Sequence, residues 1–248
     1  MFRKEQRKKV AFVDFDGVIL TTPNVKSQTV LKHVSDFTKV ALNSQRTSYR
    51  LSDKTINIIN QELYTAYGHT VLGVNRMLCS GTLSASSPHA YALDDFNHMV
   101  YDTVTVEQSN RKENEMSDAD ACAWRGFLTQ MKQVNIPVYI FSNAPLEWCE
   151  TFIDMSEVDG FICDDKWTKS SSFYVKPYPQ IYRWIENKFP DTDLLFWDDK
   201  MINFKSCMHD PRWKKVLVNK NFVAPGQCTP HFFYTPCIED IPQTLILQ

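Results

Sequence analysis

The sequence lacks the features that mark several common protein classes. Its 248 residues carry a formal net charge of −2, so no excess of positive charge favours nucleic acid as a partner. No apolar stretch reaches the roughly 18 residues that a membrane-spanning helix needs. The first residues also lack the apolar core of a signal peptide. We therefore expect a cytoplasmic protein with neither nucleic acid nor a membrane as partner.

Cysteine and histidine show no pattern of a metal or redox site. The seven cysteines are odd in number and scattered, and no Cys-x-x-Cys pair occurs among them. A structural zinc site or a redox pair is therefore not expected, and reduced thiols agree with a cytosol-like compartment. The six histidines have no metal-ligand spacing either. Nothing in the sequence indicates the oligomeric state.

Apolar runs separated by helical patterns predict an α/β protein. Near-continuous apolar runs are typical of parallel strands that are covered on both faces. They occur at residues 10–13, 137–141, 161–163, 194–197 and 216–218. Helical spacing lies between them, for example over residues 121–131 and 181–189. This alternation predicts a Rossmann-like, doubly wound parallel sheet with right-handed crossovers.

A long segment after the first predicted strand interrupts this alternation. Amphipathic spacing within it predicts helices, and these lie near residues 30–41, 56–67 and 92–104. Ser52 and Asp53 are candidates to cap the second of them. We interpret residues 22–117 as a helical cap inserted into a core that comprises residues 1–21 and 118–248. The proline-containing tail from residue 222 is expected to be mainly irregular.

Two acids follow the first apolar run, in the segment Asp14-Phe15-Asp16-Gly17-Val18. A strand that delivers an Asp-x-Asp pair to the edge of a sheet suits phosphoryl chemistry. The first carboxylate can attack phosphorus and bind a metal ion, and the second can donate and later remove a proton. Alone the pair is a weak signal, because Asp-x-Asp also begins many turns.

The other predicted strands also end in polar groups. Ser142-Asn143 follows the second strand, Asp198-Asp199 ends the fourth, and Lys176 precedes the helix that leads into the fourth. Parallel sheets place ligands at the carboxyl ends of their strands. Two acidic strand ends can share Mg²⁺, while a hydroxyl group and an ammonium group can hold phosphate oxygens. Taken singly, these residues could equally be a helix cap, a turn and an exposed lysine.

Together, these segments resemble the four motifs of the haloacid dehalogenase-like superfamily of phosphohydrolases. The matching segments, in order, are residues 14–18, 139–143, 176–182 and 196–199, the last followed by Asn203. The resemblance implies that Asp14 is the nucleophile and forms an aspartyl-phosphate. It implies that Asp16 is the general acid and then the base. Dehalogenases of the superfamily lack this second acid, so Asp16 favours phosphate chemistry.

The same resemblance assigns the remaining roles at the site. Ser142, Asn143 and Lys176 would bind the phosphoryl group. Mg²⁺ would be held by Asp14, by the backbone carbonyl of Asp16 and by Asp199, with Asp198 supporting or replacing Asp199. Lys200 stands where many relatives have Ser or Thr, so it is expected to alter the electrostatics of the metal site.

Part of the inserted segment resembles the cap of pyrimidine 5′-nucleotidase-like members. Residues 62–74 carry this resemblance, and residues 95–101 carry a looser one, although Gly17-Val18 replaces the Asn-Thr common in that group. The resemblance makes a nucleoside 5′-monophosphate the specific substrate expectation. The candidate substrate contacts in the cap are Tyr64, Tyr67, His69 and Arg76. Core packing is an equal alternative for the two tyrosines.

The expected function is that of a Mg²⁺-dependent phosphomonoesterase whose partner is a small soluble phosphate ester. A sugar-phosphate or phosphoglycolate phosphatase would use the same chemistry. A different class is a binding protein that keeps the fold and turns over weakly. Nucleic-acid end processing would need a basic groove, which the composition does not indicate.

Overall fold

A mostly parallel β-sheet forms the centre of the protein. The computed structural model describes residues 7–22, 25–43, 50–79, 91, 93–102, 116–162 and 175–247. The sheet has seven strands in the order β3-β2-β1-β4-β5-β7-β6. The strands are β1 (Lys8–Val13), β2 (Val138–Phe141), β3 (Gly160–Ile162), β4 (Thr192–Asp198), β5 (Trp213–Val218), β6 (Gly226–Thr229) and β7 (Phe232–Thr235).

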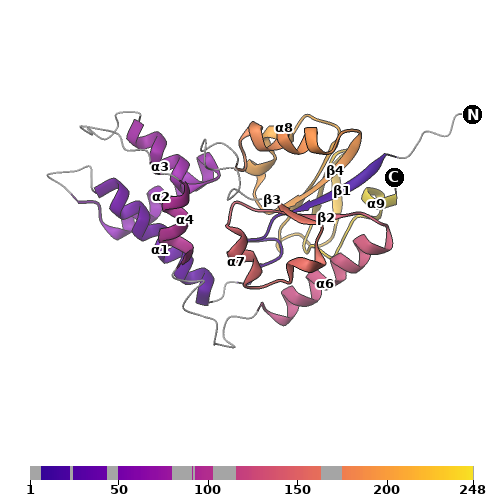
Figure 1. The fold of residues 1–248 in the computed structure, drawn as a ribbon, viewed down its shortest axis with the longest axis horizontal. Coiled ribbons are helices and arrows are strands. Elements are labelled where there is room, and N and C mark those ends of the chain that lie inside the picture. The colour runs from indigo at the N-terminus through magenta and orange to yellow at the C-terminus, as the bar shows by residue number, and fades with distance from the viewer. Residues whose placement is uncertain are drawn as a thin grey trace, which may run out of the picture.

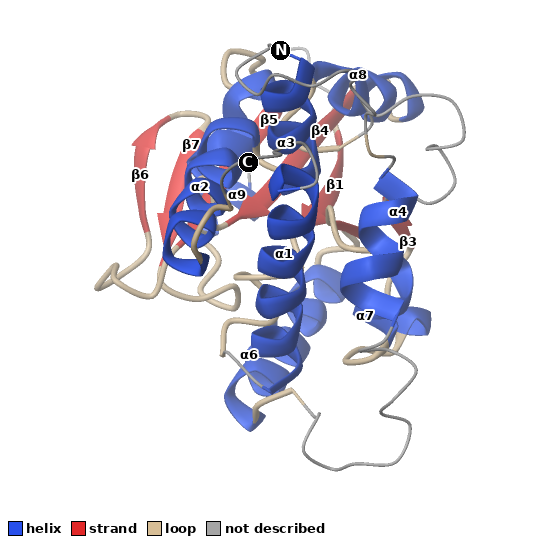
Figure 2. Ribbon diagram, turned by 90° about the vertical axis from the view of Figure 1, so that its left-hand side faces the viewer, coloured by secondary structure: helices blue, strands red, loops and turns tan. Residues whose placement is uncertain are grey.

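The strand order creates a switch point beside β1. The chain runs from β1 to β2 and β3 on one side, then returns to β4 on the other side of β1. All strand pairs are parallel except β6 with β7, which form one edge of the sheet in Figure 2. Ligands of such sheets bind where the strand order reverses. The predicted Rossmann-like α/β fold is confirmed.

Helices cover both faces of the sheet, as a doubly wound fold requires. They are α6 (Asp118–Gln133), α7 (Leu146–Glu150), the 3₁₀ turn η3 (Met155–Glu157), α8 (Pro179–Lys188), the 3₁₀ segment η5 (Met201–Cys207) and α9 (Gln243–Leu247). In Figure 1, α8 lies above the strands and α6 below them. Side chains of β1 alternate between the two buried layers: Ala11 and Val13 pack with α6, Val10 and Phe12 with α8. This alternation explains the continuous apolar run, because both faces are buried.

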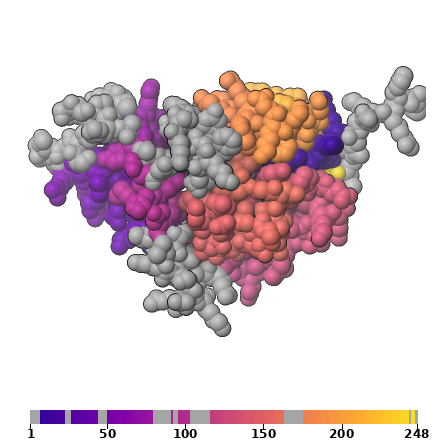
Figure 3. Space-filling view, in the orientation of Figure 1, coloured from indigo at the N-terminus to yellow at the C-terminus, as the bar shows by residue number. Residues whose placement is uncertain are grey.

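A second group of helices lies to one side of the sheet (Figure 1). It comprises α1 (Val25–Asn43), α2 (Asp53–Tyr67), α3 (Thr70–Cys79), α4 (Leu93–Asn97) and the π-helical turn η1 (His98–Asp102). We call this group the helical lobe. Its surface meets that of the sheet-containing part in the space-filling view (Figure 3). Ser52 begins α2 as expected, since its side chain accepts a hydrogen bond from the Thr55 N–H at 3.2 Å.

The tail is more regular than expected. The expectation was a mainly irregular tail from residue 222, but β6, β7 and α9 lie there. Phe233 of β7 is buried in the core, and the ring of Tyr234 covers Gly226 on the neighbouring strand. A Cβ on Gly226 would lie 2.2 Å from that ring, so the glycine makes room for the aromatic side chain.

The helical lobe also differs in detail from the expectation. Helix α3 was not predicted from its spacing. The third expected helix, over residues 92–104, is α4 followed by η1, while residues 92 and 103–104 lie outside the described part. The described chain contains no helix with the length and apolar character to cross a bilayer. The cysteines with described side chains are free thiols.

Candidate active site

The carboxyl ends of β1 and β4 bring three acids together at the switch point. The Asp14 N–H donates to the carbonyl of Trp197 at 2.9 Å, which fixes the end of β1 against the end of β4. Asp14, Asp198 and Asp199 each offer a carboxylate oxygen, and these oxygens lie within 4.8 Å of one another. The early and the late acids thus meet in space, although about 180 positions separate them along the chain.

Lys176 is the cation at the centre of this group. Its side chain is 1% exposed, and its Nζ lies 2.9 Å from Asp14 Oδ1 and 2.7 Å from Asp198 Oδ2. The rings of Phe141 and Phe196 lie 5.2 and 5.5 Å from the ammonium group. Burial alone would lower the pKa of Lys176, but the two carboxylates outweigh it and raise its pKa. The ammonium group therefore stays charged at neutral pH.

Asp14 lies in a site that favours additional positive charge. Burial raises the pKa of Asp14 well above its ordinary value; Lys176 opposes this rise, and Asp198 and Asp199 add to it. The Phe15 N–H also donates to Asp14 Oδ1 at 2.7 Å. Because Lys176 does not offset the effects of burial and of the neighbouring carboxylates on Asp14, a cation beside them would stabilise the ionised form of Asp14.

The two adjacent acids at the end of β4 have different partners. Asp198 is fully buried and accepts from Asn203 Nδ2 at 2.9 Å on both oxygens, from the Lys200 N–H at 2.8 Å and from Lys176. Asp199 is partly exposed and pairs with Lys200 Nζ at 2.5 Å. Asp198 is thus committed to holding Lys176, and Asp199 is the more accessible carboxylate.

Gly17 lets the loop after β1 pass close to Asp199. Its φ of +87° is in the left-handed region, and a Cβ at this position would lie 2.4 Å from Asp199 Oδ2. Its N–H donates to the Leu20 carbonyl at 2.9 Å, which closes the loop. A side chain at position 17 would therefore strain the backbone and displace the carboxylate.

Asp16 is the exposed acid of the first motif. Its Oδ1 accepts a hydrogen bond from Trp148 Nε1 at 3.1 Å. The protein packed around this carboxyl group raises its pKa to about 6, with Trp148 opposing the rise and Asp199 adding to it. A carboxyl group with this pKa can give and take a proton near neutral pH.

Trp148 is the site residue that sequence reasoning missed. It lies on α7, directly after the second motif, and belongs to no motif itself. An isolated tryptophan in a helical pattern predicts core packing, and Trp148 is indeed buried. Only the folded chain shows that its indole N–H points at Asp16.

Ser142 and Asn143 follow β2 and lie beside the Lys176 loop. The buried Ser142 Oγ accepts from the Ala144 N–H at 3.1 Å. The Asn143 amide makes two hydrogen bonds of 2.9 Å with the backbone of Lys176, one to its carbonyl and one from its N–H. Both the oxygen and the nitrogen of the amide are therefore engaged, and the Asn143 side chain supports the backbone of Lys176. If Asn143 contacts phosphate, the contact is expected to come from its backbone N–H.

Tyr64 brings the helical lobe to the carboxylates. Burial raises the pKa of its phenol well above the ordinary value, and the charges of Asp14, Asp198, Asp199 and Asp16 raise it further. The residue as a whole nevertheless remains 40% exposed. Tyr64 thus lies beside the acidic cluster with a free ring surface, as a substrate contact requires.

The other three candidates of the helical lobe have different surroundings. Tyr67 and Arg76 lie near Tyr178. Burial is the main cause of the raised pKa of Tyr178; Tyr67 raises this pKa further, and Arg76 lowers it. His69 is 5% exposed, and its ring packs 4.9 Å from that of Phe96. Burial lowers the pKa of His69 to about 4, so it is neutral. This position leaves His69 little surface for the predicted substrate contact.

The turn after α2 contacts the loop that carries Lys176. Gly68 ends α2 with a φ of +72°, and a Cβ there would lie 2.4 Å from Pro177 Cδ and 3.2 Å from the Lys176 carbonyl. The Asn143 Nδ2 also lies 3.5 Å from the Gly68 carbonyl. The helical lobe is thus in direct contact with the loop that carries Lys176.

The donor set fits Mg²⁺. Asp14 and Asp199 offer oxygen atoms, which this hard cation prefers, and these oxygens lie within 4.8 Å of one another. The ammonium group of Lys200 would compete with Mg²⁺ for Asp199, because it already pairs with this carboxylate.

Comparison with known proteins supports the fold. No family model and no curated protein matches the chain. A crystal structure of CbbY from Rhodobacter sphaeroides in complex with phosphate is 12% identical, with a TM-score of 0.51 over 85% of this chain and 86% of that chain. A mutant of that protein with xylulose-(1,5)bisphosphate is 14% identical, with a TM-score of 0.50 and the same coverage.

A third similar structure is a 2-haloacid dehalogenase from Pseudomonas syringae pv. Tomato DC3000. It is 11% identical, with a TM-score of 0.50 over 96% of this chain and 98% of that chain. At these identities the likeness concerns the fold, and the narrower resemblance to pyrimidine 5′-nucleotidase-like members stays a prediction. The protein thus has the α/β fold of these haloacid dehalogenase-like structures.

Proposed function

We propose that this protein is a Mg²⁺-dependent phosphomonoesterase that works through an aspartyl-phosphate on Asp14. The observation that carries the proposal is the meeting of Asp14, Asp198 and Asp199 around the Lys176 ammonium group. A nucleophile, a cation and metal-binding oxygens at one point are what in-line phosphoryl transfer requires. Asp16, two residues from the nucleophile, supplies a proton donor.

In the first step, the Asp14 carboxylate attacks phosphorus. An oxygen–phosphorus bond forms to Asp14, the bond to the ester oxygen breaks, and Asp16 gives its proton to the departing oxygen. Lys176 and Ser142 hold the other phosphoryl oxygens. Asp14, Asp199 and the carbonyl of Asp16 would hold Mg²⁺, which would supply positive charge that neutralises the phosphoryl group.

In the second step, water hydrolyses the aspartyl-phosphate. Asp16 is now ionised and takes a proton from water, whose oxygen bonds to phosphorus while the bond to Asp14 breaks. Inorganic phosphate leaves, and both acids return to their starting forms. A pKa of about 6 suits both directions of transfer near neutral pH.

The helical lobe is proposed to act as the cap, with residues 22–117 as the inserted segment. Tyr64 beside the carboxylates and Gly68 against Pro177 support this role, because they place α2 over the site. Such a cap would exclude water until the leaving group has departed. It would also provide the contacts that select the substrate.

A nucleoside 5′-monophosphate is the leading substrate hypothesis. The partly exposed ring of Tyr64 supports it, since an aromatic side chain can stack on a base. A sugar phosphate is the second candidate, because the similar CbbY mutant is in complex with xylulose-(1,5)bisphosphate. The substrate would in either case be a small soluble ester.

The test is a phosphate-release assay across nucleoside 5′-monophosphates, sugar phosphates and phosphoglycolate, with Mg²⁺ and with EDTA. We expect Mg²⁺-dependent turnover of at least one class, and a loss of about 10³-fold or more in Asp14→Asn. Turnover that survives in Asp14→Asn would contradict the mechanism. Absence of turnover by the wild type on the whole panel would favour the binding-protein alternative, in which Lys200 keeps Asp199 occupied.

A further inference from the structure

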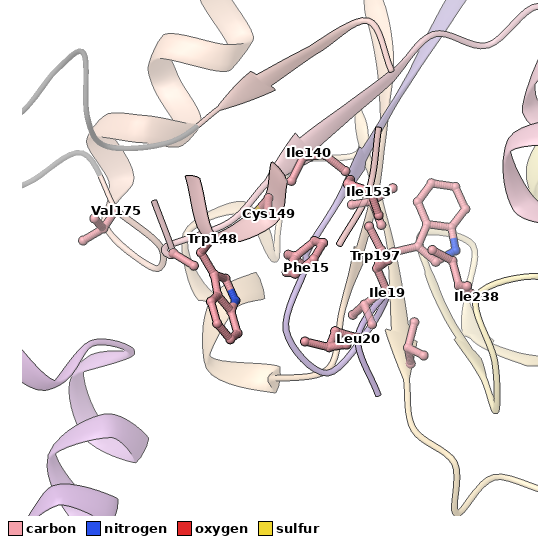
Figure 4. Close-up of a cluster of buried hydrophobic side chains, with 14 of the residues drawn as sticks. Phe15, Ile19, Leu20, Ile140, Trp148, Cys149, Ile153, Val175, Trp197 and Ile238 are labelled. Carbon is pink, nitrogen blue, oxygen red and sulfur yellow. The ribbon is translucent and has the colours of Figure 1, made fainter. Parts of the chain in front are cut away.

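Trp148 makes the hydrogen bond that fixes the proposed acid. Its Nε1 lies 3.1 Å from Asp16 Oδ1, and its side chain is 1% exposed. Figure 4 shows its indole ring in the buried cluster that also contains Phe15 and Ile19. The hydrogen bond thus joins a buried donor to an exposed carboxyl group of the site.

Aromatic neighbours on two sides hold the indole ring in place. Phe152 packs edge-on against it with ring centroids 4.9 Å apart, and Tyr101 of η1 lies at 5.7 Å. Phe152 in turn lies 6.0 Å from Phe15, which separates the two acids of the first motif. Packing of this kind restricts the rotamer, so the direction of the N–H is fixed.

The hydrogen bond also determines which oxygen of Asp16 carries the proton. A carboxylic acid has one hydroxyl group, and its carbonyl oxygen is the stronger acceptor of an N–H. With Oδ1 accepting from Trp148, the proton resides on Oδ2. The indole therefore orients the donating oxygen as well as the carboxyl plane.

We propose that Trp148 is a positioning residue that aims the Oδ2 proton of Asp16 at the ester oxygen of the substrate. This inference rests on the proposed function, in which Asp16 protonates the leaving group as the phosphorus–oxygen bond breaks. Because Tyr101 belongs to the helical lobe, its contact with Trp148 also links that lobe to the acid.

The test compares two esters that differ in their need for a proton. p-Nitrophenyl phosphate has a good leaving group and needs little protonation, whereas glycerol 2-phosphate releases an alkoxide that must be protonated. For Trp148→Phe we expect kcat/KM to fall about 10- to 100-fold for glycerol 2-phosphate and less than about 3-fold for p-nitrophenyl phosphate, since general acid catalysis contributes up to about 10⁴-fold. A merely structural role would lower both values alike.

Trp124→Phe is the matched control. Trp124 is 2% exposed on α6, and its Nε1 has no hydrogen-bond partner among the described residues. The same substitution there removes an indole N–H from the core without touching Asp16. We expect the ratio of the two kcat/KM values to stay at that of the wild type.

A second variant separates the hydrogen bond from the packing. Benzothienylalanine at position 148 replaces the indole N–H by sulfur and keeps the ring shape, so it should show the same selective loss even if Trp148→Phe does not fold. Equal loss on both esters, or no loss, would overturn the role of Trp148. Absence of wild-type turnover on both esters and on every phosphate ester of the panel above would instead overturn the proposed function, and this inference with it.

Discussion

At the scale of single residues, the site is a balance between carboxylates and two lysines. Lys176 could be singled out from the sequence, because it stands in the right order among the other motifs. Lys200 could be flagged as unusual, but its 2.5 Å contact with Asp199 depends on the fold. Nothing in the sequence indicated that Trp148 contacts Asp16, because the direction of an indole N–H is set by tertiary packing.

The pairing of Lys200 with Asp199 predicts the effect of removing this lysine on metal binding. In Lys200→Ser, Mg²⁺ no longer competes with an ammonium group, so its Kd should fall about 2- to 5-fold, the range for a half-exposed ion pair. Isothermal titration calorimetry with Mg²⁺ measures this directly. Lys205→Ser is the control for net charge, because Lys205 is an exposed lysine of η5, the element that directly follows Lys200. Equal affinities of the two variants would contradict the competition.

Burial of His69 predicts a pH-dependent loss of stability. Its pKa is about 4 in the folded chain against an ordinary 6.5, so the unfolded chain binds more protons between these values. Stability therefore falls as the pH is lowered through this window, and His69 accounts for about 2 kcal/mol of the loss between about pH 7.5 and pH 5. Urea unfolding of His69→Gln should show a correspondingly smaller difference between the two pH values. The same difference as in the wild type would show that His69 is protonated in the folded state.

At the scale of elements, turns were harder to predict than helices. The amphipathic spacing of α2 and its Ser52 cap were visible in the sequence, and the helix ends at Gly68. The contact of that turn with Pro177 was not visible, because it joins elements about 110 positions apart. Helix α3 was not predicted, because only two residues separate it from α2 and no clear turn signal marks where it begins.

The Gly68 turn predicts that a single methyl group disturbs the lysine loop. Gly68→Ala requires a left-handed backbone and brings Cβ to 2.4 Å from Pro177 Cδ. We expect a loss of about 1–3 kcal/mol in unfolding free energy, together with a lower kcat, because the Lys176 loop must shift. Chemical denaturation and phosphatase kinetics measure the two effects.

Gly126→Ala is the control for this substitution. Gly126 lies within helix α6. A Cβ on Gly126 would meet only the flexible side chain of Glu239, at 2.9 Å. Alanine is favoured over glycine in a helix interior, so stability should stay constant or rise. If Gly68→Ala behaves like Gly126→Ala, the turn and the lysine loop are not coupled.

At the scale of the whole molecule, the sequence predicted the central sheet better than its edge. Strands β1, β2, β4 and β5 are buried on both faces and therefore have continuous apolar runs. β6 lies at the edge of the sheet and is exposed, so it shows no such run. The placement of the helical lobe against the site depends on tertiary contacts that spacing does not encode.

The most direct test of the account is to find where the phosphoryl group is attached during turnover. Wild-type protein mixed with substrate and Mg²⁺ is quenched in acid and digested, and its peptides are examined by mass spectrometry. The account predicts one phosphoryl group on the peptide that contains Asp14, converted by borohydride to homoserine at that position and absent from Asp14→Asn. A label on any other residue, or turnover with no phosphorylated protein and undiminished activity in Asp14→Asn, would contradict it.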